Sequence, residues 1–239
     1  MVFGADEAGR GPVCGPMVAA AVLADPETLP AGVADSKTLT SAKRGALAAE
    51  IGDNDRIEAG IAVVSPRRID DPETDMNALT IAAQAKAIGR ALDAGTDADG
   101  DTDATGEDRT SGGWAGVVHP SGVVDACDVD SERFARRVSE AIPVPVDVHA
   151  EHRADETHAI VAAASVLAKV ERDSLVADLG DRYREYGPVG SGYPSDSRTR
   201  TFLREFVRAN DALPACARTS WKTSRDVLEA AEQSALGEF

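Results

Sequence analysis

The sequence predicts an α/β domain followed by a helical extension. Short apolar runs typical of strands alternate with helical segments along most of the chain. In addition, the segment 160–168 is small and apolar nearly all round, as in a helix buried against a sheet. With 239 residues, 43% of them hydrophobic, the chain is long enough for one such domain with a packed core and an extension.

Five segments have the pattern of strands. The first is apolar at Val2, Phe3 and Ala5 and is followed at once by two acids, and the third alternates between inward and outward positions. The second is expected to pair with the first. The expected strands lie at residues 2–5, 18–23, 57–63, 116–124 and 144–148.

Helices are expected between and after these strands. Thr40 or Ser41 is placed to cap the first, and Asp130 to cap the third. Residues 94–113 consist mainly of Gly, Asp, Thr and Ala, with six acids and one arginine, which predicts an acidic low-complexity loop inserted into the domain. The expected helices lie at residues 40–51, 75–92, 131–141, 157–179, 197–209 and 220–236.

The net charge of −16 would ordinarily argue against a nucleic-acid partner. However, arginine far outnumbers lysine and aspartate outnumbers glutamate, which indicates a salt-adapted protein, and in molar salt the screening length falls to about 3 Å. Residues 182–225 also hold nine basic and four acidic residues. This segment is either a nucleic-acid-binding surface or a solvated helix face.

Other features predict a cytoplasmic protein without a membrane span. The chain has no run of about 18 apolar residues, and no basic region precedes the apolar stretch after Pro16, so a signal peptide is not expected. The three widely spaced cysteines, Cys14, Cys127 and Cys216, suit a reducing compartment and are interpreted as small core residues.

Acids recur at the ends of the predicted core elements. Asp6 and Glu7 follow the first strand, Asp125 ends the fourth, and Asp155 precedes the long helix. Neighbouring strand side chains point to opposite faces, so Asp6 and Glu7 are expected to share a site only if the strand ends or twists there. Carboxylates without histidine or cysteine partners suit Mg²⁺ or Mn²⁺, and two such ions can hydrolyse a phosphodiester.

Each acid also has a simpler interpretation. Asp6 and Glu7 can be solvated residues of a turn, and Asp155 can be a helix N-cap. Asp128 or Asp130 can replace Asp125, and spacing does not choose among them. The four histidines lack ligand spacing, and the sequence contains neither a nucleophile elbow nor a P-loop.

The motifs together resemble those of ribonuclease HII, the type 2 ribonucleases H, particularly the archaeal branch. Residues 6–12, Asp-Glu-Ala-Gly-Arg-Gly-Pro, with Gly15-Pro16, are similar to the opening signature of the family. The resemblance covers almost the whole chain, and the composition suggests a halophile. Further matches follow in order at Asp35-Ser36-Lys37, Val124-Asp125, Ala154-Asp155, Ala163-Ala164-Ser165, Ala168-Lys169-Val170 and residues 190–196.

The resemblance implies a ribonuclease H-like fold, with a five-stranded mixed sheet flanked by helices. Residues 1–185 would form the catalytic domain, and residues 186–239 a helical C-terminal extension that contributes to substrate binding. The implied activity is endonucleolytic cleavage of the RNA strand of RNA–DNA hybrids, and cleavage at single ribonucleotides embedded in duplex DNA. Two-metal-ion catalysis would leave 5′-phosphate ends, in RNA primer removal and ribonucleotide excision.

The resemblance also assigns roles to residues. Asp6, Glu7, Asp125 and Asp155 would be the catalytic acids and hold Mn²⁺ or Mg²⁺, two ions with substrate bound; this selects Asp125 over its neighbours. The other implied contacts are with substrate: Gly9, Arg10 and Gly11 with the 2′-hydroxyl of the scissile ribonucleotide, Tyr193 with the following sugar, and Lys37, Arg44 and Lys169 with phosphates. A monomer is expected, and contact with a sliding clamp is left open.

Three departures from the family pattern and three competing classes remain. The stretch 94–113 has no counterpart in the family core, His158-Ala159 replaces the usual Tyr-Pro, and the acidic surface is unfavourable for binding at low salt. Ribonuclease HIII carries an added N-terminal domain, whereas this sequence opens on its first strand. A sugar-kinase or actin-like phosphotransferase needs glycine-rich phosphate loops, and a non-catalytic binding module would lack one of the acids.

Overall fold

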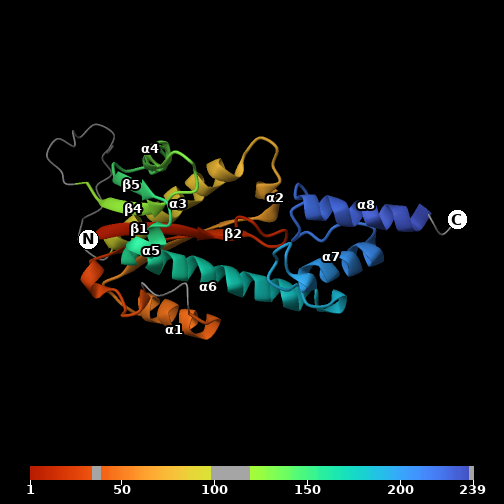
Figure 1. Cartoon of the computed structure of the whole chain (residues 1–239). Helices are drawn as coiled ribbons and strands as arrows, with labels where there is room; N and C mark the ends of the chain where they lie inside the picture. The colour runs from red at the N-terminus through yellow and green to blue at the C-terminus, as the bar shows by residue number, and fades with distance from the viewer. Residues whose placement is uncertain (34–38, 98–118, 237–239) are drawn as a thin grey trace, which may run out of the picture.

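A mixed sheet lies between two helical layers, and two further helices extend from one end (Figure 1). The computed structural model describes residues 1–33, 39–97 and 119–236. Its sheet has five strands in the order β3-β2-β1-β4-β5, which confirms the expected fold class. The strands are β1 (Val2–Ala8), β2 (Met17–Ala24), β3 (Glu58–Val64), β4 (Ser121–Asp125) and β5 (Asp147–Glu151).

The register of the sheet brings the ends of two parallel strands together. β1 is antiparallel to β2, and β2 is antiparallel to β3. β4 is parallel to both of its neighbours, β1 and β5. Ala5 pairs with Val124, so the residues that follow them, Asp6 and Asp125, lie side by side. The carboxyl ends of β1 and β4 therefore form one acidic edge.

Each face of the sheet has its own core. Helices α6 (Ala159–Arg182) and α1 (Ser41–Gly52) cover one face, and α3 (Met76–Asp97) and α4 (Ser131–Ala141) cover the other. The α6 helix runs close against β1. A Cβ built on Gly4 would lie only 2.6 Å from the backbone carbon of Ile160, so there is no room for a side chain at this position. The small residues of α6 thus serve close packing on the central strand.

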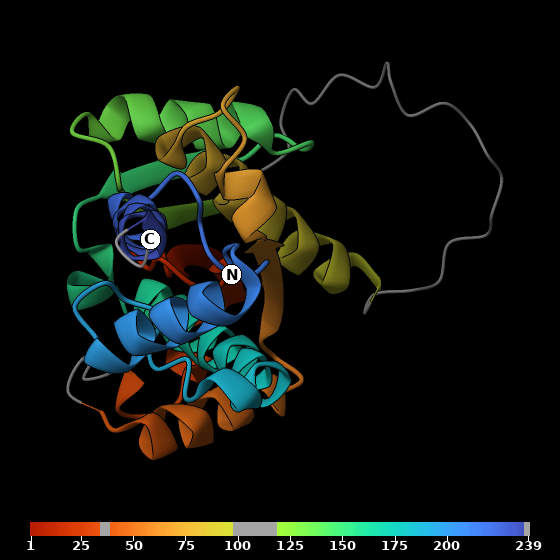
Figure 2. The same ribbon diagram turned by 90° about the vertical axis from the view of Figure 1, so that its right-hand side faces the viewer.

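The C-terminal helices share a third core with the rest of the domain. Helices α7 (Ser197–Asn210) and α8 (Lys222–Leu236) pack beside each other at one end of the sheet (Figure 2). Their core includes Phe202 and Leu203 and also Val13 and Cys14, from the loop after β1. The extension is therefore joined to that loop by packing.

Several boundaries differ from those expected. β4 begins at Ser121, and residues 116–118 of the expected strand lie outside the described residues. β5 covers 147–151 rather than 144–148, because Pro143 and Pro145 cannot donate to a ladder. Helix α3 continues through residues 94–97, and the remainder of the predicted acidic loop, from 98, lies outside the described residues. His158 separates α6 from a short helix, so the long helix begins at 159 rather than 157.

The remaining elements are short. They are η1 (Pro26–Thr28), α2 (Pro66–Ile69), α5 (Ala154–Thr157) and η3 (Arg184–Tyr186). The caps of two helices agree with expectation, since Thr40 accepts from the Lys43 amide and Asp130 from the Arg133 amide. None of the helices in the described ranges is long and apolar enough to cross a membrane.

Candidate active site

Asp6 and Glu7 reach the acidic edge from opposite faces of β1. The strand continues to Ala8, so the expected break after the acids is absent. Asp6 points toward α6, where Ser165 hydrogen-bonds its carboxylate. Glu7 points toward α3, where Gln84 Nε2 donates to Glu7 Oε2 at 2.7 Å. The alternation of side chains along β1, rather than a turn, directs one carboxylate toward α6 and the other toward α3.

The two other predicted acids lie beside Asp6. Asp125 ends β4, and its Oδ1 accepts a hydrogen bond of 2.7 Å from the amide of Ala154. Asp155 is buried in the first turn of α5 rather than at its N-cap, which is Arg153. Both carboxylates act electrostatically on Asp6. The structure thus gathers the four acids at one edge of the sheet.

Burial and mutual repulsion favour the protonated forms of two of these acids. Burial, opposed by the Ser165 hydrogen bond and reinforced by the charges of Asp125 and Asp155, raises the pKa of Asp6 to about 7. Burial and the Asp6 charge raise the pKa of Glu7 to about 8, against the lowering effects of Gln84 and Arg10. Within the described ranges, no three acidic, histidine or cysteine side chains are arranged to hold a metal ion.

The loop after β1 lies against Arg172 of α6. Gly9 has a φ of 89°, and a Cβ there would lie 2.5 Å from Arg172 Nε, so this position requires glycine. The Arg10 side chain turns back toward the acids: its Nη2 donates to Asn77 at 2.8 Å, and its Nε lies 3.8 Å from Glu7 Oε1. In this structure Arg10 therefore neutralises part of the Glu7 charge.

One cavity of about 350 Å³ connects Glu7, the one predicted catalytic acid among its described lining residues, to most of the predicted substrate-binding residues. Tyr193 is 40% exposed at its rim, with the Arg172 guanidinium 5.3 Å from the ring centroid. Lys37 lies outside the described residues. The predicted residues that line the cavity are Glu7, Gly9, Arg10, Gly11, Arg44, Lys169 and Tyr193, together with Ala8, Arg172 and Asp173.

Two alternatives for the third acid have other partners. Asp128 accepts a hydrogen bond of 2.6 Å from Arg133 Nη2, and Asp130 caps α4.

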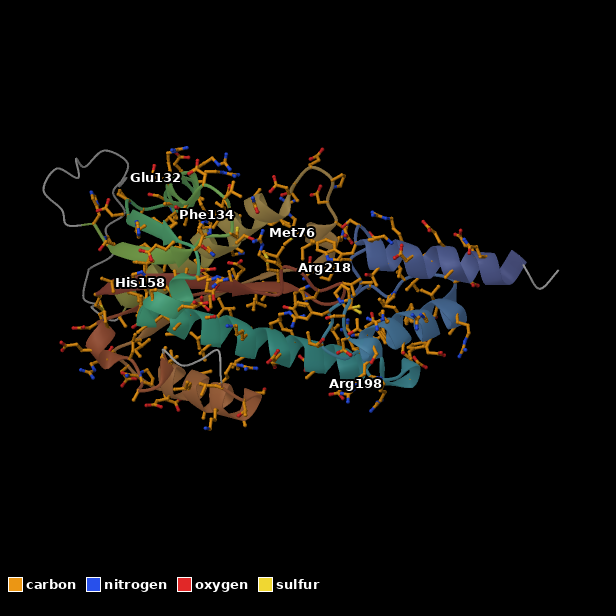
Figure 3. All side chains as sticks on the ribbon, in the orientation of Figure 1. Met76, Glu132, Phe134, His158, Arg198 and Arg218 are labelled. Carbon is orange, nitrogen blue, oxygen red and sulfur yellow. The ribbon has the colours of Figure 1, made fainter. Side chains whose placement is uncertain are left out.

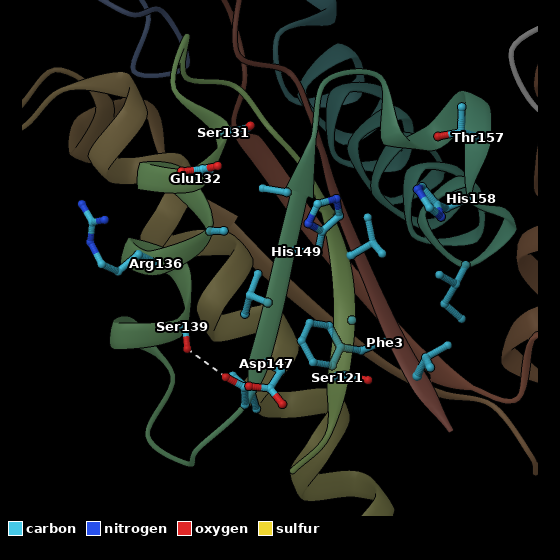
Figure 4. Close-up of a pocket in the computed structure, with 18 of the residues that line it drawn as sticks. Phe3, Ser121, Ser131, Glu132, Arg136, Ser139, Asp147, His149, Thr157 and His158 are labelled. Carbon is cyan, nitrogen blue, oxygen red and sulfur yellow. Dashed lines mark hydrogen bonds between the residues drawn. The ribbon is translucent and has the colours of Figure 1, made fainter. Parts of the chain in front are cut away.

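A larger cavity, of about 1070 Å³, lies along β5 between α4 and the start of α6 and contains none of the predicted site residues (Figure 4). The acidic edge is thus separate from this hollow.

Four polar residues that support the site were given no role from the sequence, although Ser165 lies in one of the motifs that resemble the family. Gln84 and Ser165 are fully buried in otherwise apolar helices and contact Glu7 and Asp6. A buried polar residue in an apolar helix is the signal that would have found them. Arg218 was noted only as part of the basic segment 182–225, and Arg172 was given no role. The contacts of both side chains are with loops that are distant in sequence.

Comparisons with known proteins agree with the geometry. The profile of the family described as Ribonuclease HII matches residues 3–99 and 115–224. A ribonuclease HII of Halobacterium salinarum is 50% identical over 241 residues, which covers 99% of each protein. The family profile does not extend over residues 100–114.

Solved structures of archaeal proteins have the same fold. The ribonuclease H2 from Pyrococcus horikoshii OT3 superimposes with a TM-score of 0.77 at 33% identity, over 97% of this chain and 99% of that one. Ribonuclease HII from Archaeoglobus fulgidus, solved in a complex with PCNA, gives 0.72 at 34% identity, over 95% and 96%. This chain belongs to the ribonuclease HII family, metal-dependent hydrolases that cleave the RNA strand of RNA–DNA hybrids.

Proposed function

We propose that this ribonuclease also cuts at single ribonucleotides embedded in duplex DNA, leaves 5′-phosphate ends, and serves RNA primer removal and ribonucleotide excision. One observation carries the proposal: a single cavity joins Glu7 to the Gly9–Gly11 loop, to three further basic side chains and to Tyr193. A 2′-hydroxyl is what distinguishes one ribonucleotide from its DNA neighbours. A close-fitting backbone loop beside the acids is suited to detect it.

The acids fit divalent metal ions. The Asp6 and Glu7 side chains are buried, and burial together with repulsion from the neighbouring acids raises their pKa values. All four donors are carboxylates, the ligands that Mg²⁺ and Mn²⁺ prefer. We assign Asp6, Glu7, Asp125 and Asp155 to holding two ions when substrate is bound, after rotation of their side chains. Such ions activate water and stabilise the leaving oxygen in phosphodiester hydrolysis.

The chain's own groups orient the substrate. Lys169 Nζ donates to Ser165 Oγ at 2.7 Å, and Ser165 in turn contacts Asp6, so this lysine links a phosphate contact to an acid. Arg44 is held at the cavity by a hydrogen bond of 2.8 Å from its Nη1 to Leu39 O, and its Nη2 lies 3.4 Å from Asp173 Oδ2; we assign it to a phosphate contact. We assign Lys37 to the same role on sequence alone.

We assign different parts of the site to the two regions of the chain. Residues 1–185 supply the acids and the loop, and residues 186–239 supply Tyr193 and basic groups for duplex binding. We also propose that the protein acts as a monomer.

Cleavage assays at molar salt test this function. The substrates are a duplex with one ribonucleotide, a continuous hybrid and an all-DNA duplex, each with Mg²⁺, with Mn²⁺ or with EDTA. Asp125→Asn should reduce the cleavage rate on the order of 100-fold or more while duplex binding survives, because most contacts are made by other groups. Asp128→Asn is the matched control. An active Asp125→Asn with an inactive Asp128→Asn would overturn the assignment, and an uncut single-ribonucleotide duplex would overturn the proposed substrate.

A further inference from the structure

Arg218 is the largest fully buried side chain in the described part of the protein. It precedes α8 and lies where the C-terminal helices meet the end of the sheet (Figure 3). No ion pair in the described ranges involves this guanidinium. Although it belongs to the basic segment 182–225, a side chain with 0% exposure cannot bind a phosphate. A buried guanidinium that has no carboxylate partner must be stabilised by hydrogen bonds to other groups.

The Arg218 guanidinium is bound by backbone carbonyl groups of the loop after β1. Its Nη2 donates to Gly9 O at 2.5 Å, its Nη1 to Arg10 O at 2.7 Å, and its Nε and Nη2 to Gly15 O at 3.1 and 3.0 Å. The Arg218 amide also donates to Val13 O at 2.8 Å. The planar fork of donors thus holds both ends of the loop at once.

Trp221 extends this set of contacts by one residue. Its Nε1 donates to Gly11 O at 3.2 Å, and its ring lies 5.0 Å from Arg218 Cζ. Three successive carbonyl oxygens, of Gly9, Arg10 and Gly11, are therefore bound from the C-terminal segment. Burial lowers the pKa of Arg218 to about 10, so the guanidinium remains charged at neutral pH.

The bound carbonyls determine where the loop amides point. The loop contains no cis peptide bond, and in a trans peptide unit the N–H points away from the C=O. The Arg10 and Gly11 amides therefore point away from Arg218. Neither donates a hydrogen bond to any residue within the described ranges. Residues 9–11 line the cavity beside the acids, whereas Arg218 does not.

We propose that Arg218, assisted by the Trp221 indole, is a positioning residue that fixes the Arg10 and Gly11 amides as a pair of donors for the 2′-oxygen of the scissile ribonucleotide. The inference rests on the proposed function, since it assumes that the loop detects a 2′-hydroxyl. It assigns the C-terminal segment a part in ribonucleotide selection as well as in duplex binding. It also explains why an arginine is required, because a lysine ammonium cannot bind three carbonyl groups in one plane.

Equilibrium binding without divalent metal, where no cleavage occurs, tests the proposal. The measured quantity is the ratio of affinities for a duplex with one ribonucleotide and for the same duplex made only of DNA. Arg218→Lys should lower this ratio about tenfold, the equivalent of one or two lost hydrogen bonds, with little change in affinity for the all-DNA duplex. The cleavage rate at the embedded ribonucleotide should fall with it. Arg136→Lys, at an arginine 64% exposed on α4, is the matched control.

A second variant keeps the test decisive if Arg218→Lys does not fold. Trp221→Phe retains a ring over Arg218 and removes only the N–H donor to Gly11, so it should lower the ratio by a smaller factor. A folded Arg218→Lys or Trp221→Phe with the wild-type ratio but reduced overall affinity would overturn the positioning role. A wild-type ratio of one would instead overturn the proposed recognition of the 2′-hydroxyl, and with it this inference.

Discussion

Gln84 Nε2 donates one hydrogen bond to Glu7 Oε2, at 2.7 Å, and a second to the carbonyl oxygen of Asp125, at 3.1 Å. One buried amide on α3 thereby connects the ends of β1 and β4, the two strands that carry acids. Its own Oε1 is buried and has no hydrogen-bond partner among the described residues. A buried oxygen without a partner is unfavourable, so the favourable contribution of Gln84 lies in its two hydrogen bonds at the acidic edge.

Replacing Gln84 with leucine should therefore reduce activity more than stability. The change removes the donor that holds the Glu7 carboxylate and lowers its pKa, while the leucine fills the same buried space. We expect kcat to fall about tenfold, the equivalent of one hydrogen bond to a charged group, with little change in KM. Thr80→Val, at another buried polar residue of α3, is the control and should leave kcat unchanged. Wild-type kcat in Gln84→Leu would show that Glu7 is held by other groups.

The metal-free protein should lose stability as pH rises, and Glu7 should account for part of the loss. The pKa of Glu7 is raised from 4.5 to about 8 in the folded state, so the folded state binds its proton more tightly than the unfolded state. The stabilisation by this proton is complete below pH 4.5 and is lost as pH rises through about 8. Glu7→Gln lacks this dependence, so in EDTA it should be the more stable protein at pH 9.

Thermal unfolding in EDTA at constant molar salt, compared at pH 5 and pH 9, measures this effect. Glu132→Gln, at an exposed glutamate of α4, is the control and should follow the wild type. Added Mg²⁺ or Mn²⁺ should raise the Tm of the wild-type protein at pH 9. It should raise the Tm of Glu7→Gln less, because that variant lacks one of the carboxylates. Parallel curves for Glu7→Gln and wild type would mean that the Glu7 carboxylate is not strained by burial.

Local patterns predicted the elements of this fold better than their ends. Alternation and small apolar residues located all five strands and the buried α6. Pro143 and Pro145 lie just before β5, and because proline has no amide donor the strand begins only at Asp147. The strand end expected after Ala5 is absent, because pairing with β2 continues to Ala8. Such pairing depends on a partner strand and cannot be inferred from one segment.

The same limit applies to the site. The acids and the loop carry short motifs, so their resemblance to the family located them. Arg218 is separated from Gly9 by most of the chain, and its contacts are with carbonyl groups that every residue possesses. No side-chain pattern encodes such a contact. The choice of Asp125 over Asp128 also depended on the family, whereas in the structure the Arg133 contact of Asp128 distinguishes them.

Removing residues 100–114 should leave folding and cleavage intact. The family profile matches on both sides of this interval and not within it. The interval is rich in acids and poor in residues that can be buried, and the loop-closure cost of a long surface insertion is small. The deletion variant should keep the wild-type Tm and cleavage rate at molar salt, and bind duplexes more tightly at low salt, where repulsion is less screened. A folded but inactive variant would show that the interval contributes to the site.

Tyr193 should matter more for one embedded ribonucleotide than for a continuous hybrid. Its loop is fixed to the loop after β1, because the Val13 and Cys14 amides donate to Gly192 O at 2.8 and 3.1 Å. The Arg172 guanidinium lies over the Tyr193 ring, and the residue is 40% exposed, so the ring is positioned and accessible for stacking. Stacking is worth roughly 1–3 kcal/mol, and a single site must be held in one register, whereas a hybrid offers many equivalent positions.

Cleavage rates of the wild type, Tyr193→Ala and Tyr193→Phe on the two substrates, at matched salt, measure this preference. Tyr193→Ala should lose on the order of tenfold or more at the single ribonucleotide, as expected for one lost stacking contact, and clearly less on the hybrid. Tyr193→Phe keeps the ring over Arg172 and should stay close to wild type on both. Equal losses on the two substrates for Tyr193→Ala would mean that the ring supports the fold or general binding, since a contact that fixes the register at one ribonucleotide must discriminate between them.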